Sequence, residues 1–141
     1  MFVLEMIASI SRIERFNAAH RLHNPKWSDT QNADFFGLCN NPNYHGHNYK
    51  LIVKVTGEVD PDTGYLMDIK KLKDIIRSEV TGRYDHKNLN LDVAEFKDFN
   101  PSAEHIAYVA WHRIREKLDP DFKLHVTLYE TDRNIVEYEG E

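Results

Sequence analysis

The sequence predicts an α+β fold in which two helices pack on one face of a four-stranded antiparallel sheet. Apolar residues alternate with polar ones near both ends of the chain, but they recur at helical spacing in the middle. This strand–strand–helix–helix–strand–strand order keeps strands and helices apart, which is typical of α+β proteins. The length of 141 residues and a composition that is 41% hydrophobic and 29% charged favour one globular domain, residues 1–141.

Two strands are expected in the N-terminal part of the chain. Residues 4–18 carry β-branched residues in weak alternation, which favours a strand. From His47 the alternation becomes regular, and four apolar side chains share one face of the second strand: Tyr49, Leu51, Val53 and Val55. Residues 59–65, VDPDTGY, have the composition of a turn that ends this pair.

The helical period in the middle of the chain predicts two helices. The first runs from Ile69 to Val80, with Asp68 as its N-cap and Gly82 as its stop. The second follows the segment NPSAE, in which Ser102 or Asn100 is the cap. Its apolar stripe consists of Ala107, Ala110, Trp111, Ile114 and Leu118.

Two further strands are expected at the C-terminal end. Apolar and polar residues alternate over residues 123–128, residues 130–134 form a connection, and residues 135–138 return. An open sheet of four strands leaves two edges with unpaired backbone groups. Pairing of these edges between copies of the chain would protect them, so we expect an oligomer.

Charge and cysteine content exclude several classes of protein. The net charge of −5 argues against a nucleic-acid partner, which normally requires a basic surface. The single cysteine cannot form an internal disulfide and indicates the reducing cytoplasm. The first residues lack the pattern of a signal peptide, and no apolar run approaches the roughly 18–20 residues of a membrane span. We therefore expect a cytoplasmic protein without a membrane partner.

The triplet His45-Gly46-His47 at the start of the second strand has two interpretations, a metal site or an ordinary pair of histidines that is exposed or satisfied by hydrogen bonds. Residues two apart on a strand point to the same side, and two buried imidazoles need partners for both ring nitrogens. A third ligand is expected from His20, with His23 as the competing candidate. Three histidines with an open position are typical of catalytic zinc, whereas two histidines and a carboxylate would indicate non-haem iron.

Cys39 lies upstream of this triplet in a segment rich in Asn and Pro. A free cysteine is most often a small buried hydrophobic residue. Its loop setting favours a second interpretation, a thiolate beside the metal that serves as a base or nucleophile. The sequence leaves both open.

Two further segments carry polar residues that could take part in catalysis or ligand binding. Asp85 can orient His86 for acid–base work if a turn brings them together, although an ordinary polar turn would look the same. Glu130 has the parity of the core-facing residues Leu124 to Leu128. It either binds a ligand with adjacent N–H donors or faces water beyond the strand.

Taken in order, five motifs resemble the 6-pyruvoyl-tetrahydropterin synthase family over nearly the whole chain: FNAAHRL, CNNPNYHGHNYKL, DHKNLNLD, PSAEHIA and YETDRNIVEY. The resemblance implies a T-fold subunit whose sheets join between subunits into a barrel. It also implies a homohexamer of two stacked trimers, with the active site between subunits. The implied reaction converts 7,8-dihydroneopterin triphosphate to 6-pyruvoyl-tetrahydropterin and releases triphosphate, for tetrahydrobiopterin synthesis, without a redox cofactor.

The same resemblance assigns roles to residues that match the family motifs. It implies Zn²⁺ on the three histidines, Cys39 as the general base, and Asp85 with His86 as a second proton-transfer pair. Glu130 would anchor the pterin through its N–H edge. Glu104 and Ser102 would also bind the substrate. The three histidines that would bind the metal are His20, His45 and His47.

This sequence departs from the family pattern at three positions. Tyr44 stands where a glycine is often found, and Ser102 and His105 replace Thr and Asn. A related branch, the 6-carboxy-tetrahydropterin synthases of queuosine synthesis, has a shorter gap between the cysteine and the histidine pair. The five residues Asn40 to Tyr44 favour the pyruvoyl branch.

Two classes of protein outside pterin synthesis would also carry such a histidine group. One is a zinc- and pterin-binding module without turnover, in which the cysteine has no chemical role. The second is a zinc hydrolase that acts through a metal-bound hydroxide and therefore needs no cysteine. Replacement of Cys39 distinguishes both from a synthase that uses the thiol as its base.

Overall fold

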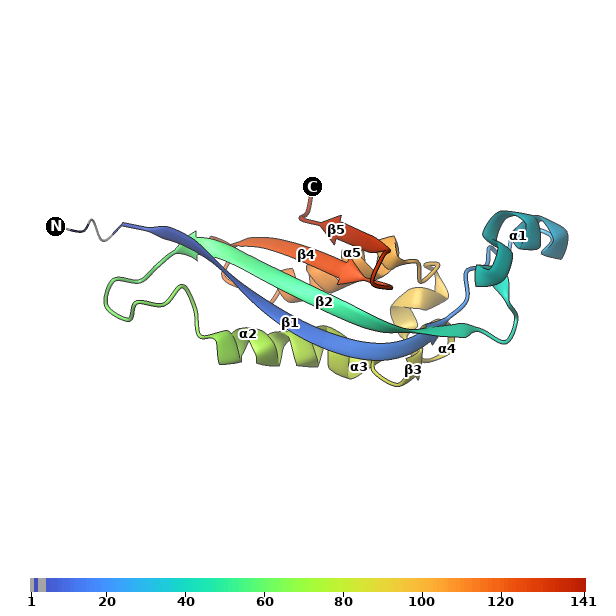
Figure 1. Cartoon of the computed structure of the whole chain (residues 1–141), viewed down its shortest axis with the longest axis horizontal. Coiled ribbons are helices and arrows are strands. Elements are labelled where there is room, and N and C mark those ends of the chain that lie inside the picture. The colour runs from blue at the N-terminus through green and yellow to red at the C-terminus, as the bar shows by residue number, and fades with distance from the viewer. Residues whose placement is uncertain (1, 3–4) are drawn as a thin grey trace.

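A computed structural model describes residue 2 and residues 5–141 of the chain. Its centre is a five-stranded sheet with the strand order β3-β1-β2-β4-β5, and the two longest helical segments cover one face of that sheet (Figure 1). The α+β class expected from the sequence is therefore confirmed. Among the described residues, no helix combines the length and apolar character that a bilayer span requires.

Strands β1 (Ile7–His20) and β2 (His45–Glu58) form a long antiparallel hairpin (Figure 1). The first strand extends two residues beyond the expected end at Ala18, and its expected start at residue 4 lies outside the described residues. Register places His20 opposite His45 and Ala18 opposite His47. The histidines therefore lie at the end of the hairpin that leads into the β1–β2 connection.

Strands β4 (Lys123–Tyr129) and β5 (Ile135–Tyr138) agree with the sequence prediction. β4 pairs antiparallel with β2, and β5 pairs antiparallel with β4. The connection between them is closed by a 3.0 Å hydrogen bond from the Glu130 N–H to the Asn134 carbonyl.

A fifth strand, β3 (Lys87–Asn88), was not expected from the sequence. It pairs in parallel with Ala18 and Ala19 of β1, so the sheet has five strands and is not purely antiparallel. Two residues are too few for an alternating pattern to show. Their pairing depends on where the preceding helix delivers the chain, which is a tertiary effect.

Helix α2 (Ile69–Ile76) begins as expected, because the Asp68 side chain accepts a 2.9 Å hydrogen bond from the Lys70 N–H. The expected stop at Gly82 is wrong. The chain continues through a π-helical turn, η2 (Arg77–Thr81), into α3 (Gly82–Tyr84). A side chain on Gly82 would place its Cβ 2.5 Å from the Arg77 carbonyl oxygen, so the wider turn requires a glycine there.

Helix α5 (Ala103–Arg115) is capped by Ser102 and not by Asn100, since the Ser102 side chain accepts a 3.2 Å hydrogen bond from His105 N–H. Four shorter segments were not predicted. Helix α1 is capped by Ser28, but it buries only Asn32, so it lacks an apolar stripe to reveal it. The four segments are α1 (Asp29–Phe36), η1 (Gly37–Asn40), α4 (Leu89–Asp92) and η3 (Ala94–Lys97).

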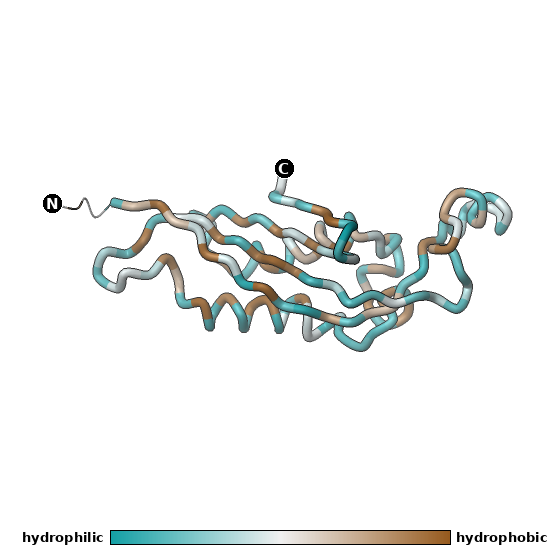
Figure 2. Tube along the Cα trace, viewed as in Figure 1, coloured by the Kyte–Doolittle hydropathy of each residue, from teal (hydrophilic) through white to brown (hydrophobic). Residues whose placement is uncertain are grey.

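One hydrophobic core joins the sheet to the helices. Inward-facing residues of β1, β2 and β4 and the apolar stripes of α2 and α5 belong to a single buried cluster, so both helices cover the same face. Figure 2 shows the apolar segments along β2 and α2 that build it. The triad of histidines continues the inward-facing rows of β1 and β2, and the core therefore positions it.

Candidate metal centre and active site

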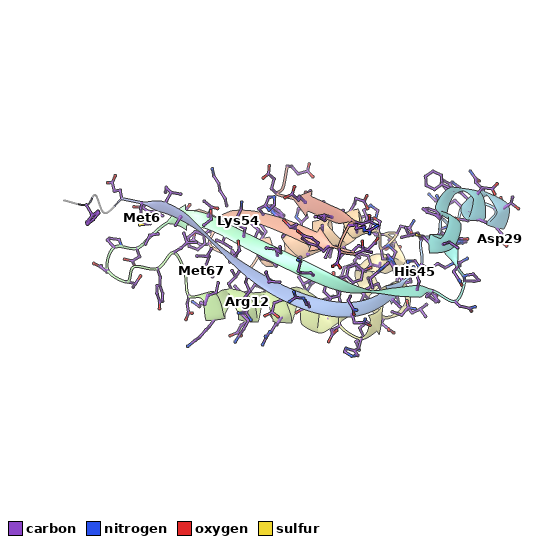
Figure 3. The ribbon with its side chains drawn as sticks, in the orientation of Figure 1. Met6, Arg12, Asp29, His45, Lys54 and Met67 are labelled. Atoms are coloured by element: carbon purple, nitrogen blue, oxygen red, sulfur yellow. The ribbon has the colours of Figure 1, made fainter. Side chains whose placement is uncertain are left out.

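Three histidines converge at the end of the β1–β2 hairpin. His20, His45 and His47 each offer a ring nitrogen, and these three atoms lie within 4.8 Å of one another. The ring centroids are 4.5 to 5.0 Å apart. Figure 3 marks His45 at the end of the sheet nearest α1. The strand alternation expected from the sequence thus brings the three imidazoles to one point on the core side of the sheet.

The hydrogen bonding of the triad leaves one nitrogen of each ring free for a ligand. His20 Nδ1 lies 2.7 Å from the Pro101 carbonyl oxygen, so Nδ1 carries the proton and donates it, and Nε2 keeps its lone pair. His20 Nε2, His45 Nδ1 and His47 Nε2 are buried and have no hydrogen-bond partner. Buried polar atoms without partners are costly, and a shared cation would satisfy all three.

Burial also keeps His20 and His45 neutral, which is the form that binds a metal. Desolvation is the main cause that lowers the pKa of His20 to about 4; the hydrogen bond to Pro101 opposes this shift, and His45 and His47 add to it. Burial and the nearby His47 lower the pKa of His45, although Glu130 opposes this shift. At neutral pH these imidazoles carry lone pairs rather than charges.

Small residues make room for the triad. Ala18, a buried residue, lies opposite His47 across the hairpin. Gly46, between the two histidines of β2, lies on the opposite face, where an added Cβ would be 3.4 Å from the Ala18 carbonyl oxygen. That is ordinary contact, so nothing within the described part of this chain requires a glycine at position 46.

Glu130 lies beside the triad at the end of β4. Its Oε2 is 3.9 Å from His20 Nε2, and its side chain is only 18% exposed. Tyr49, next inward on β2, is fully buried and places its hydroxyl 3.4 Å from His20 Nδ1. Burial raises the pKa of Tyr49, and Glu130 adds to the shift. Of the two interpretations left open by the sequence, the structure favours a Glu130 that faces the site.

Asp85 and His86 form a pair at the edge of β1, as the turn hypothesis requires. Asp85 Oδ2 lies 2.9 Å from His86 Nδ1. Asn17 of β1 donates its N–H to Asp85 Oδ1 at 2.8 Å, and its carbonyl accepts the His86 N–H at 2.6 Å. The bond from Asn17 holds the pKa of Asp85 below its usual value, and His86 contributes. The side-chain hydrogen bonds of this pair run to each other and to Asn17, not to the triad.

Cys39 is partly buried in η1, the short turn before β2. Its carbonyl accepts a 2.9 Å hydrogen bond from the N–H of Leu22, two residues after His20. The backbone carrying the thiol is thereby tied to the strand that carries the first histidine.

The segment at the start of α5 supports the triad. Pro101 supplies the carbonyl that holds His20, and Ser102 caps the helix. Glu104 is exposed in the first turn, and His105 Nδ1 is 2.6 Å from the Asn100 carbonyl oxygen. The competing ligand His23 is not part of the triad, because its ring nitrogens do not lie within the group formed by the other three histidines. Its Nδ1 lies 3.0 Å from the Asn40 side-chain amide.

Sequence reasoning missed the asparagines around this site. Asn40, Asn90 and Asn100 bind the backbone that follows His20, and their side chains replace regular strand pairing. A run rich in Asn was visible in the sequence, but Asn is common in ordinary turns. Only the fold shows which backbone groups these amides reach.

Comparison with known proteins adds independent support. The sequence model of the family described as 6-pyruvoyl tetrahydropterin synthase matches residues 9–141. The chain is 44% identical over 134 residues to the 6-pyruvoyl tetrahydrobiopterin synthase of Homo sapiens, covering 95% of this chain and 92% of that protein. The enzyme of the same name from Drosophila melanogaster is 41% identical over 135 residues, covering 95% of this chain and 80% of that protein.

A solved structure agrees with the sequence relatives. The 6-pyruvoyl tetrahydropterin synthase of Caenorhabditis elegans matches with a TM-score of 0.91 and 39% identity, covering 99% of this chain and all of that one. Fold and site together define a T-fold protein with a group of histidines that can hold a metal ion. The chain belongs to the 6-pyruvoyl tetrahydropterin synthase family, as its motifs predicted.

Proposed function

We propose that this chain converts 7,8-dihydroneopterin triphosphate to 6-pyruvoyl-tetrahydropterin and releases triphosphate, in the synthesis of tetrahydrobiopterin. The observation that supports it most directly is the set of three buried ring nitrogens without partners, one from each histidine of the triad. Membership of an enzyme family whose relatives carry this name supplies the reaction.

We propose that the metal is Zn²⁺, held by His20, His45 and His47. Three neutral imidazoles with room for a further ligand are the donor set of catalytic zinc sites. The separation of the donor atoms and the Nδ1 hydrogen bond of His20 fit such an ion. When bound, it would act as a Lewis acid toward the hydroxyl groups of the substrate side chain.

The proton transfers are assigned to this chain's own residues. Cys39 would take a proton from the side-chain carbon of the pterin substrate as general base. His86, oriented by the Asp85 carboxylate 2.9 Å from its Nδ1, would be the second proton-transfer group. These transfers rearrange the side chain as the triphosphate leaves, and no external oxidant is needed.

Substrate orientation is assigned to carboxylates near the site. Glu130, partly buried beside His20, would accept hydrogen bonds from the N–H edge of the pterin ring. Glu104 and Ser102 lie at the start of α5, the segment whose Pro101 carbonyl holds His20. They would contact the ring from that side.

We further propose that residues 1–141 act as one domain and assemble into a homohexamer of two stacked trimers, with the active site between subunits. Two features support this assembly. β3 covers β1 only at Ala18 and Ala19, so the described part of β1 before them is a long sheet edge. The Asp85–His86 pair is held at that edge, where a neighbouring chain can approach.

The direct test is a product assay with the purified, zinc-loaded protein. Incubation with 7,8-dihydroneopterin triphosphate should give a pyruvoyl pterin and free triphosphate, identified by mass spectrometry. A carboxy product with acetaldehyde would place the chain in the queuosine branch with the same site. If the metal-loaded protein gives no product, the alternative function, a zinc- and pterin-binding module without turnover, would be supported.

Cys39→Ala separates a cysteine-dependent synthase from a zinc hydrolase. The variant should retain its metal and lose turnover, because the general base is gone while the histidines remain. Full activity in this variant would refute the role of Cys39. Elemental analysis and circular dichroism of both proteins control for metal loss and misfolding.

A further inference from the structure

The backbone between His20 and α1 is held by asparagine side chains. Asn90 Oδ1 accepts the Arg21 N–H at 2.8 Å, and its Nδ2 donates to the Arg21 carbonyl at 2.9 Å. Asn32 makes the same two bonds with Asn24, at 2.7 and 2.9 Å. Each amide thus binds both backbone groups of one residue, as a neighbouring strand would.

At Leu22, between those two positions, the two bonds come from different groups. The Leu22 N–H donates to the Cys39 carbonyl at 2.9 Å. The Leu22 carbonyl accepts a 2.8 Å hydrogen bond from the side-chain Nδ2 of Asn40. Cys39 and Asn40 therefore bind Leu22 together, and this attaches the turn carrying the thiol to the strand carrying His20.

The backbone of the turn does not supply the second bond itself. The next amide along the chain, Asn41 N–H, is used within η1, where it donates to the Leu38 carbonyl at 3.2 Å. The Asn40 side chain is only 8% exposed, and its Nδ2 also contacts His23 Nδ1 at 3.0 Å. The identity of residue 40 therefore matters, since a backbone group does not replace its amide.

The residues that flank Leu22 are held in place by hydrogen bonds. The His20 ring is held by the Pro101 carbonyl at 2.7 Å, and the His23 N–H is held by Asn100 Oδ1 at 2.9 Å. Pro101 and Asn100 are neighbours before α5, so one rigid segment fixes both flanks of Leu22. The hydrogen bond from Asn40 Nδ2 to the Leu22 carbonyl therefore holds the cysteine turn at a fixed place beside Leu22.

We propose that Asn40 is a positioning residue, which sets the place of Cys39 relative to the metal centre through the Leu22 carbonyl. The proposal rests on the proposed function, in which Cys39 is the general base. Loss of the Asn40 donor should displace the thiol, and misplacement by about 1 Å can lower the rate on the order of 100-fold.

The test compares Asn40→Asp with Asn32→Asp. Both changes replace a buried amide by a carboxylate of the same shape that cannot donate to a carbonyl. Asn32 lies in the same connection but binds Asn24 and α1 rather than the cysteine turn. With zinc content equal, Asn40→Asp should lower kcat between roughly 10- and 100-fold with KM nearly unchanged. Asn32→Asp should lower Tm similarly and leave kcat near that of the unmodified protein.

A second readout does not depend on turnover. Cys39 is the single cysteine, so iodoacetamide reports on it alone. Its alkylation should be several-fold faster in Asn40→Asp and unchanged in Asn32→Asp, because only the first change removes a bond between the cysteine turn and Leu22. If Asn40→Asp does not fold, Asn40→Ser, whose side chain is too short to keep the bond, is measured in its place.

The outcomes separate this proposal from the proposed function. Equal kcat and equal alkylation rates in the two variants would overturn the positioning role and leave the activity intact. A protein that makes no pterin product would overturn the proposed function. In that case faster alkylation in Asn40→Asp would still support the attachment of Cys39 to Leu22 through Asn40.

Discussion

Two clusters that contain histidine adjoin strand β1, but their surroundings are opposite. In the triad of His20, His45 and His47, one nitrogen of each ring is buried without a partner. His86, tied to β1 through Asn17, has a side chain that is 83% exposed, and its Nδ1 is bonded to Asp85. The first cluster thus keeps buried nitrogen atoms available for a ligand, whereas the second is exposed and already paired.

This difference indicates how each cluster is stabilised. Buried imidazoles without partners destabilise the folded chain, so the triad is explained by a ligand that compensates for the cost. The exposed pair carries no such cost, and local hydrogen bonds hold it in place. The triad is complete in one chain, while the Asp85–His86 pair faces outward, as a group serving a neighbouring site would.

The largest effect is expected from removing a triad ligand. His47→Ala should abolish metal binding, and activity should fall by more than the roughly 100-fold typical of losing an outer-shell partner. His125→Ala is the matched control, since His125 lies on β4 and contacts Glu137. Elemental analysis and the product assay provide the measurements. Full metal occupancy in His47→Ala would contradict the assignment of this ligand.

The second prediction tests whether one active site takes its triad and its Asp85–His86 pair from the same subunit or from two different subunits. His86→Ala should keep its metal and lose roughly 10²- to 10⁴-fold in rate, the usual contribution of acid–base catalysis. Co-assembly of His86→Ala with His47→Ala should restore part of the activity. Some mixed interfaces would then combine an intact triad from one subunit with an intact pair from another.

Separately purified variants, combined without co-assembly, are the control for this experiment. If co-assembled proteins stay as inactive as the separate variants, the triad and the pair act within the same chain. The two clusters could then act on one substrate only after a rearrangement inside the subunit.

The third prediction uses the burial of the triad. The pKa of His20 is lowered from 6.5 to about 4, so the unfolded chain binds its proton more readily than the folded one. Stability is therefore full above pH 6.5 and declines as the pH falls toward 4. Between about pH 7.5 and about pH 5, the metal-free protein should lose about 2 kcal/mol of unfolding free energy through His20 alone.

Urea unfolding of the metal-free protein at several pH values measures this loss. His20→Gln removes the titrating group and should give a shallower dependence, with the remainder due to His45, whose pKa is also lowered. An unfolding free energy that does not change over this pH range would show that His20 is not held neutral by burial.

The smallest expected effect concerns backbone strain, which each cluster has at one position. Tyr44, before His45, has φ 68°, and His86 has φ 61°, a region that costs residues with a Cβ about 1–2 kcal/mol. Tyr44→Gly should therefore be more stable than Tyr44→Ala by about 0.5–1 kcal/mol, after the larger entropy of glycine in the unfolded chain is subtracted. Equal stability of the two variants, measured by urea unfolding, would contradict this explanation.

The strain also explains the departure at Tyr44. The family pattern led us to expect a glycine at this position, and the positive φ of Tyr44 is a backbone angle that glycine adopts without strain. A backbone angle is not visible in a single sequence. The same holds for Gly82, where a glycine is required because the π-helical turn that precedes it brings the Arg77 carbonyl oxygen close.

The parts of the fold with strong local patterns were predictable. The alternation from His47 fixed the faces of β2, and the stripe from Ile69 fixed the start of α2. Helix α1 and strand β3 were missed because one has no apolar stripe and the second is only two residues long. β3 is held by its pairing with the distant strand β1, whereas α1 is held by nearby residues, such as Asn24, which bonds to the Asn32 side chain.

The sequence by itself determined the chemistry available to this protein: the histidine pair two residues apart on a strand, the lone cysteine and the Asp–His neighbours. It also carried the family motifs. The tertiary structure decided that His20 and not His23 completes the triad, which ring nitrogens stay free, and that Asn40 ties Cys39 to Leu22. Local patterns reflect a residue's neighbours in the chain, whereas hydrogen-bond partners 17 or 81 residues apart meet only once the chain has folded.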